Sequence, residues 1–302
     1  MIFQEVFEMI VNWKNVPTFD VVVQDAIAEC NASPQFNLVL AYELPIDVLK
    51  SQFVAAHRAQ AEKWLSDPPP RDLFFSHAQF YRGKHGTDYV LGELERRKMG
   101  RRAILAMIDM DTILDSANRS VPAFSLLQFA IDGNVVYATA YFRALEVGVF
   151  LPSNLTEIAI HCEAIHRRFA SITTIRLFVL AFRGYCEPDF HCLEKLPIDA
   201  QPPGIIGVAV ADHQYEKLRT WLSDKRRVES VVQMQGIEEM LTAVKAAAKP
   251  YPRDFQLGLE RAVASLRAFS ELRYQLNEGS QVDEARERFD IDLTDTLNAL
   301  PR

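Results

Sequence analysis

Three arginines are the residues of this 302-residue chain whose types point most directly to chemistry: Arg101, Arg102 and Arg143. A guanidinium offers planar, paired donors that match the oxygens of a phosphate. All three lie beside apolar, strand-like stretches, and a buried cation is costly without an anionic partner. We therefore predict that Arg143 serves a phosphate or an interface. For the arginine pair, the alternative is that both residues follow a helix end and face solvent.

Two amides stand near these arginines, Gln128 and Asn154. An amide places a donor beside an acceptor, which suits the edge of a pyrimidine base. Asn154 also has a simpler interpretation, because it precedes an apolar helical run and forms an Asn-x-x-Glu capping box with Glu157. Gln128 lies in an apolar run, where its amide must be satisfied with or without a ligand.

The elements that must position these side chains alternate between helix and strand. Apolar residues at helical spacing predict helices over 2–13, 47–67 (with Asp47 as cap), 85–100 and 154–172. Short β-branched or apolar runs predict strands over 36–44, 103–110, 123–131, 135–142 and 173–182, with a last strand within 197–212. Asp132-Gly133-Asn134 predicts a tight hairpin. The expected fold class is α/β (α+β), with a mixed sheet and surrounding helices.

The composition of the chain changes after residue 212, where segments rich in Leu, Ala, Glu and Arg begin. Helical periodicity predicts helices over 214–223, 228–248 and 254–278, and we expect the acidic terminus, 279–302, to be partly mobile. We therefore divide the chain into a domain at 1–212 and a helical extension at 213–302. An apolar stripe in the extension must be buried on the core, on a second copy or on a partner protein; it comprises Val263, Leu266, Phe269 and Leu272.

Composition narrows the function classes. The net charge of −7 argues against general nucleic-acid binding, which needs a basic surface. The sequence contains no run long and apolar enough to span a membrane and no signal peptide, so we expect a cytoplasmic protein. Four scattered cysteines favour free thiols. The histidines and cysteines show no metal-ligand spacing, so we expect no metal. No phosphate-binding glycine loop is present, so we expect no nucleotide binding by a loop of that kind.

The spacing of the polar residues resembles the thymidylate synthase and pyrimidine hydroxymethylase superfamily. Pro122-Ala123 precede Gln128-Phe129, and Arg143 is followed by Glu146, Pro152 and Asn154 at the family's intervals. The resemblance implies a homodimer that packs sheet against sheet. It also implies that Arg143 holds the nucleotide phosphate while Arg101 and Arg102 reach the partner subunit's phosphate. Asn154 and Gln128 would then face the pyrimidine, and Tyr185 would bond the ribose.

The chemistry of that family is missing from this chain. Ala123 stands where the family has the cysteine that adds to the pyrimidine ring, and Phe124 replaces the histidine after it. Ser125 has no base close in sequence, Cys186 is an improbable substitute, and no clear match to the folate machinery remains, so we expect no cofactor.

We therefore predict a catalytically degenerate protein that binds a pyrimidine nucleotide or serves as a dimeric scaffold for a partner protein, with no catalytic residue. The alternative is an active C5 methyl- or hydroxymethyltransferase with folate and a non-standard nucleophile. A third hypothesis is a structural subunit whose pocket is filled by Phe124 and Phe142.

Overall fold

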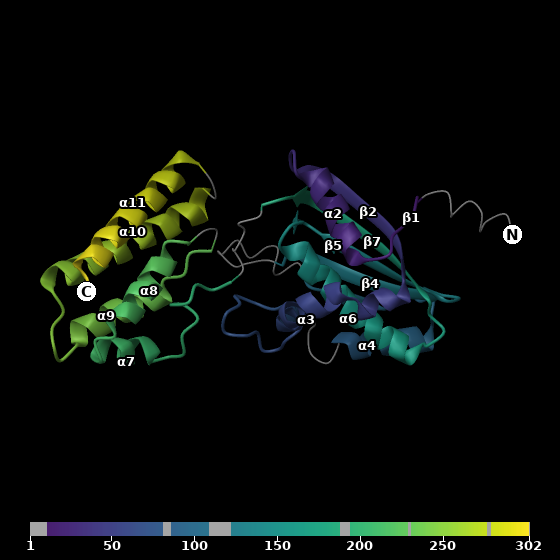
Figure 1. The fold of residues 1–302 in the computed structure, drawn as a ribbon, viewed down its shortest axis with the longest axis horizontal. Helices are drawn as coiled ribbons and strands as arrows, with labels where there is room; N and C mark the ends of the chain where they lie inside the picture. Colours follow the sequence, from purple (N-terminus) through teal and green to yellow (C-terminus); the bar gives the residue numbers. More distant parts are fainter. Residues whose placement is uncertain are drawn as a thin grey trace. The chain divides into compact units, whose positions relative to one another are not determined.

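The protein is mixed α/β, as predicted, and the computed structural model describes residues 11–80, 86–108, 122–187, 194–228, 231–276 and 279–301. It consists of two compact units (Figure 1). Unit 1 is built mainly from residues 1–69, 75–116 and 121–190, and unit 2 mainly from residues 191–302. The second unit thus begins before residue 213, where the composition changes. The predicted helix at 2–13 lies largely outside the described residues.

Unit 1 contains one mixed sheet. Over the described residues its strands follow the order β1-β2-β7-β5-β4-β3, and β6 pairs with β7. The strands are β1 (Lys14–Asn15), β2 (Gln35–Pro45), β3 (Ile104–Ala106), β4 (Phe124–Asp132), β5 (Val135–Phe142), β6 (Leu145–Glu146) and β7 (Thr174–Tyr185). The five main predicted strands are confirmed, although β3 is shorter than the run 103–110. β4 and β5 form the predicted hairpin, and Gly133 supplies the positive φ of 56°.

A single layer of helices covers one face of this sheet. It contains α2 (Phe19–Cys30), α3 (Gln52–Trp64), α4 (Gly86–Arg96) and α6 (Phe150–Arg168), and α6 contacts the other three helices. Short 3-10 turns η1 (Ile46–Lys50) and η2 (His77–Phe80) complete the layer. Ser51, rather than the predicted Asp47, caps α3 by accepting a hydrogen bond from the amide of Val54. The core of unit 1 lies between this layer and the sheet.

The opposite face of the sheet is open and apolar. Alternate residues of the central strands are buried against the helices, and the residues between them are half-buried or exposed. The apolar part of this open face comprises Val39, Ala41, Ile104, Leu126, Gln128, Ala130, Tyr137, Thr139, Tyr141, Phe178, Leu180 and Phe182. The paired side chains of Glu43 and Arg176 lie on the same side, at the end beside Trp13. Trp13 covers this end of the open face, with its ring against Tyr137 and Phe178. Among the described residues, no helix packs on the remainder.

Unit 2 is helical over its described residues. It contains α7 (Ile205–Ala211), α8 (Tyr215–Lys225), α9 (Gln235–Ala246), α10 (Arg253–Leu276) and α11 (Ser280–Ala299). The last strand predicted within 197–212 is wrong: its apolar residues form α7, whose Ile206, Ala209 and Val210 pack into a helical core. The acidic terminus forms α11 where mobility was predicted, because Val282, Phe289 and Leu293 are buried along it. The predicted apolar stripe of α10 is buried within unit 2 itself.

A buried ion pair anchors the segment before α7 to the helices of unit 2. The Lys225 ammonium donates to Asp199 Oδ2 and to the carbonyl of Gln233, both at 2.6 Å. Both charged side chains are almost fully buried, and burial lowers the pKa of Lys225 against the opposing effect of Asp199. The other carboxylate oxygen accepts the amide of Gly236 at 3.1 Å. This approach requires glycine, because a β-carbon at Gly236 would lie 2.8 Å from the carbonyl oxygen of Ile198.

We expect Gly236→Ala to destabilise the protein by about 1–3 kcal/mol, because the added methyl group must displace backbone rather than a flexible side chain. Gly207→Ala in α7 is the matched control. A β-carbon added at Gly207 would meet no described atom beyond its own helix within 4 Å, so helix propensity should make this variant neutral or stabilising by about 0.5–1 kcal/mol. Urea denaturation monitored by circular dichroism measures both effects. Equal midpoints for the two variants would contradict the close approach of Gly236 to Ile198.

Candidate functional site

Arg143 lies at a break between two strands. β5 and β6 pair with β7 in the same register, and Arg143 and Ala144 separate them. The Arg143 amide donates to the carbonyl of Ala123 at 2.9 Å, and its Nε donates to the carbonyl of Pro122 at 3.1 Å. The side chain retains exposed surface, yet desolvation by the surrounding protein lowers its pKa, while nearby Tyr185 acts in the opposite direction. Arg143 and Tyr185, both predicted from sequence, are therefore neighbours.

Glu146 follows the break and organises the start of α6. Its carboxylate accepts the amides of Gly148 (2.8 Å), Val149 (2.5 Å), Phe150 (3.0 Å) and Glu187 (3.0 Å). The first amides of a helix have no intrahelical acceptor, so a buried carboxylate there satisfies them and favours the helix dipole. Four donors saturate this group, which is therefore a structural carboxylate.

Asn154 lies inside α6, and its predicted role as the helix N-cap is wrong. The helix begins at Phe150, and Glu146 satisfies the free amides. The side chain of Asn154 is buried, at 7% exposure, within the first turns of the helix. Glu157, one turn further along, is buried as well and does not form the predicted capping box. The sequence pattern gave the wrong cap because the carboxylate of Glu146, which precedes the helix, bonds its first free amides in place of Asn154.

Gln128 does not share a face of the sheet with Asn154. Its neighbour Phe129 points to the helix layer and contacts the ring of His161 in α6, so Gln128 belongs to the open face. Its Nε2 donates to the carbonyl of Arg101 at 3.0 Å. Within one chain, Gln128 and Asn154 therefore lie on opposite sides of the sheet, whereas the resemblance implied that both face the pyrimidine.

The arginine pair also lies apart from Arg143. The carbonyl of Arg101 accepts a hydrogen bond from the side chain of Gln128, whereas the amide of Arg143 donates to the carbonyl of Ala123. Ala123 precedes Gln128 by five residues on the segment that contains β4. That separation corresponds to roughly 16 Å of extended chain. Arg101 and Arg102 are both exposed, as the simpler interpretation of the pair predicted. Their predicted contact with a phosphate held by a partner subunit stays a prediction.

A buried histidine–glutamate pair lies on the helix side of the sheet, and sequence analysis did not identify it. His77 Nδ1 and Glu157 Oε2 are 2.7 Å apart, and the two side chains are only 6% and 1% exposed. Over the described residues, Glu157 Oε1 has no hydrogen-bond partner. Burial raises the pKa of Glu157 against the opposing effect of His77. The only sequence signal for the pair was an acidic residue on the apolar face of a predicted helix.

Aromatic rings surround this pair and occupy the space beside Ala123. Trp64 stacks on His77 with ring centroids 4.9 Å apart, and Phe124 meets the other side of His77 edge-on at 5.5 Å. Phe124 in turn stacks on Phe142 at 4.4 Å. The hypothesis that Phe124 and Phe142 fill the interior at this position is consistent with these contacts.

None of the three candidate nucleophiles Ser125, Cys162 and Cys186 is activated by its surroundings. The Ser125 hydroxyl donates to the carbonyl of Ala123 at 3.3 Å rather than to a base. Burial raises the pKa of Cys162 to about 12, and burial together with the charge of Glu146 raises the pKa of Cys186. Because the thiolate is the nucleophilic form, both cysteines favour the unreactive thiol. Cys30, Cys162 and Cys186 are free, and Cys192 lies outside the described residues.

Within the described part of the chain, no cluster of three His, Cys, Asp or Glu residues could hold a metal ion. Searching the same residues reveals no helix with the length and apolarity needed to cross a membrane. No protein-family model matches the sequence. A search of curated proteins likewise finds no significant match. The resemblance to thymidylate synthases therefore rests on residue spacing alone.

His161 gives this interior a defined pH dependence. It is fully buried in α6, its Nδ1 lies 3.0 Å from Thr87 Oγ1, and desolvation lowers its pKa from 6.5 to about 4. Between these values the unfolded chain binds the proton and the folded chain does not. The contribution of His161 to stability is therefore complete above the unfolded pKa and is lost as pH falls, by up to roughly 3 kcal/mol.

We expect His161→Gln to remove this dependence, because glutamine can bond Thr87 but cannot titrate. Urea midpoints for both proteins across neutral to acidic pH give the comparison. The raised pKa of Glu157 acts with the opposite sign, but it is present in both proteins and largely cancels in the difference. Parallel curves for the two proteins would show that His161 is not buried in its neutral form.

Proposed function

We propose that the chain is a non-catalytic member of the thymidylate-synthase-like folds that works as a homodimeric scaffold. Unit 1 supplies the dimer interface, and each copy carries one helical unit 2. The observation that supports this proposal best is the open apolar face of the sheet, which the helix layer leaves uncovered on one side. Contiguous apolar surface of this kind is typical of interaction sites.

The composition of the open face suits burial in a symmetric interface. It carries aromatic and aliphatic side chains on adjacent strands, and Tyr141 and Leu180 are register neighbours on the two central strands. Phe182 is 51% exposed and Val39 is 52% exposed. Aromatic enrichment with few charges distinguishes the core of a protein interface from ordinary surface. Two copies packed sheet against sheet would remove these side chains from water.

A pyrimidine nucleotide is the second candidate, as a ligand rather than a substrate. The neighbouring side chains of Arg143 and Tyr185 favour a nucleotide ligand. Ala123 lies beside them, because its carbonyl accepts the amide of Arg143. Desolvation of the guanidinium makes it a stronger partner for a phosphate than a fully hydrated arginine. Without an activated thiol nearby, such a site would bind and release the nucleotide unchanged.

We expect light scattering coupled to gel filtration to give the mass of a dimer for the full chain. The double variant Tyr141→Lys and Leu180→Lys should give a monomer, because two lysines per copy would place like charges in an apolar interface. Ile291→Lys is the matched control, since Ile291 is an exposed apolar residue of α11 in unit 2. Its mass should not change. A wild-type monomer at all concentrations tested, or a double variant that remains dimeric, would refute the scaffold.

Calorimetric titration with dUMP, dCMP, UMP and CMP tests the second candidate. If one of them binds, Arg143→Ala should weaken binding by about 2 kcal/mol, close to thirtyfold, because a charged hydrogen bond to phosphate is lost. Arg96→Ala in α4 is the control, since Arg96 pairs with Glu93 on the helix surface. Binding unaffected by Arg143→Ala would place the nucleotide elsewhere. Absence of binding to all four would leave the scaffold alone.

A further inference from the structure

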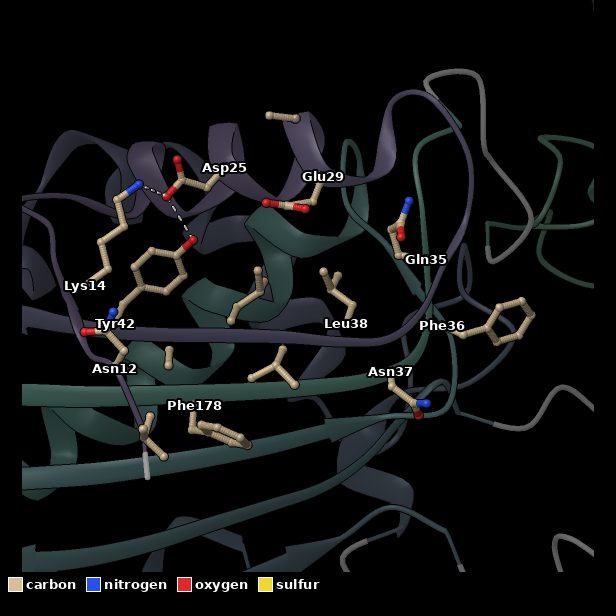
Figure 2. A pocket seen from close by; sticks show the side chains of 15 residues that line it. Asn12, Lys14, Asp25, Glu29, Gln35, Phe36, Asn37, Leu38, Tyr42 and Phe178 are labelled. Atoms are coloured by element: carbon tan, nitrogen blue, oxygen red, sulfur yellow. Dashed lines mark hydrogen bonds and ion pairs between the residues drawn. The ribbon is translucent and has the colours of Figure 1, made fainter. Parts of the chain in front are cut away.

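A groove of about 770 Å³ runs along the outer edge of β2, on the side of the sheet opposite to β4. α2 forms one wall, and residues 11–12 and Lys14 close one end. Figure 2 shows Asp25 and Glu29 reaching toward the groove from α2, while Phe178 lies on the other side of β2. The groove therefore spans both faces of the sheet at its edge. It is distinct from the surroundings of Arg143.

The floor of the groove is the edge of β2, which over the described residues is paired at one end only. β1 pairs with β2 only at Tyr42 and Glu43, and no other described strand covers this edge of β2. The carbonyl of Glu43 accepts the amide of Val16 at 3.0 Å, so the main-chain groups of Glu43 point outward. Alternate residues share that orientation, which directs the amide and carbonyl of Val39 into the groove. An edge of this kind is a template for a further strand.

The charges on the α2 wall indicate which strand would fit. Asp25 accepts hydrogen bonds from Lys14 (2.6 Å) and from the Tyr42 hydroxyl (2.9 Å), and the bond from Lys14 lowers its pKa, so this carboxylate is ionised and paired. Glu29, one helical turn further on, is exposed and makes no hydrogen bond or ion pair with any described residue. A free carboxylate above an open strand edge favours a cation at that position.

The same charges disfavour pairing with a second copy. Two β2 edges joined about a two-fold axis would bring both α2 helices together, and each carries Asp20, Asp25 and Glu29 along its length. Like charges brought together across an interface are repulsive. The opposite wall is apolar, formed by Val39, Phe36 and Phe178. A strand lying in the groove would thus meet carboxylates on one face and apolar side chains on the other.

We propose that this groove binds an extended peptide segment of a partner protein as an added strand on β2. The segment carries basic residues at alternate positions, directed to α2, and apolar residues between them, directed to the open face. The main-chain groups of β2 supply affinity, while Glu29 and the apolar wall supply specificity, as in other cases of strand addition. The proposal does not depend on a nucleotide site or on dimerisation.

The test is fluorescence anisotropy with the full-length protein and a short labelled peptide in which valine and lysine alternate. We expect saturable binding. The same peptide with N-methylated valines should not bind, because its main-chain donors are blocked, and a valine–glutamate peptide should not bind, because of its charge. These peptide controls leave the protein unaltered, so they cannot be confused with misfolding.

Glu29→Lys should weaken binding of the valine–lysine peptide about tenfold or more, a loss expected for removing one charge pair and adding a repulsion. Asp20→Lys is the matched control, because Asp20 is an exposed acid of the same helix that does not line the groove, and it should bind nearly as the wild type does.

The proposal is overturned by no binding of the peptide, by binding that survives N-methylation, or by equal effects of the two α2 variants. A dimer that the peptide dissociates would assign the groove to a second copy instead, and would also overturn it. A sheet-face dimer that persists with peptide bound is compatible with both proposals. The experiments can therefore refute the proposed dimer and the proposed peptide binding independently of each other.

Discussion

The structure of unit 1 depends on β7, a long central strand that pairs with β2 along one edge and with β5 and β6 along the other. β2 runs antiparallel along one edge, and β5 and β6 run parallel along the other in one register. Because side chains alternate across a strand, this single register decides which residues of the neighbouring strands face the helices. Leu177, Val179 and Ala181 are buried on that face, whereas Phe178, Leu180 and Phe182 face the other way. A one-residue shift would exchange the two sets.

That constraint links the fold to both proposed surfaces. The open face exists because the described helices of unit 1 cover only one side of the sheet, and its apolar side chains are those that the register directs away from these helices. Over the described residues, β1 pairs with only two residues of β2, and the rest of this edge exposes its main-chain groups to the groove. One surface is apolar and suits a second sheet, and the other combines main-chain groups with a free carboxylate and suits an extended, basic segment. The open face and the groove therefore differ in chemistry, and each suits a different kind of partner.

In the interior around Ala123, polar and ionisable side chains find their partners within the protein. Glu146 is saturated by backbone amides, His77 bonds Glu157 among aromatic rings, and the nearby thiols have raised pKa values. Polar groups in such a core must find partners inside the protein. Glu157 Oε1 makes no hydrogen bond among the described residues, and the raised pKa of this carboxyl follows from its burial.

The sequence by itself determined the fold class, the main strands, the hairpin and most helices, because these follow from local periodicity and turn chemistry. It also placed Arg143 near Tyr185 through the resemblance. Tertiary structure decided the remainder. A helix replaced the strand predicted within 197–212, since a short apolar run serves either element and only its packing partners select one. Asn154 became an interior helical residue because Glu146 caps the helix from outside it. Gln128 faces away from Asn154, and His77 meets Glu157, because strand register and helix packing bring together residues that are distant in the chain.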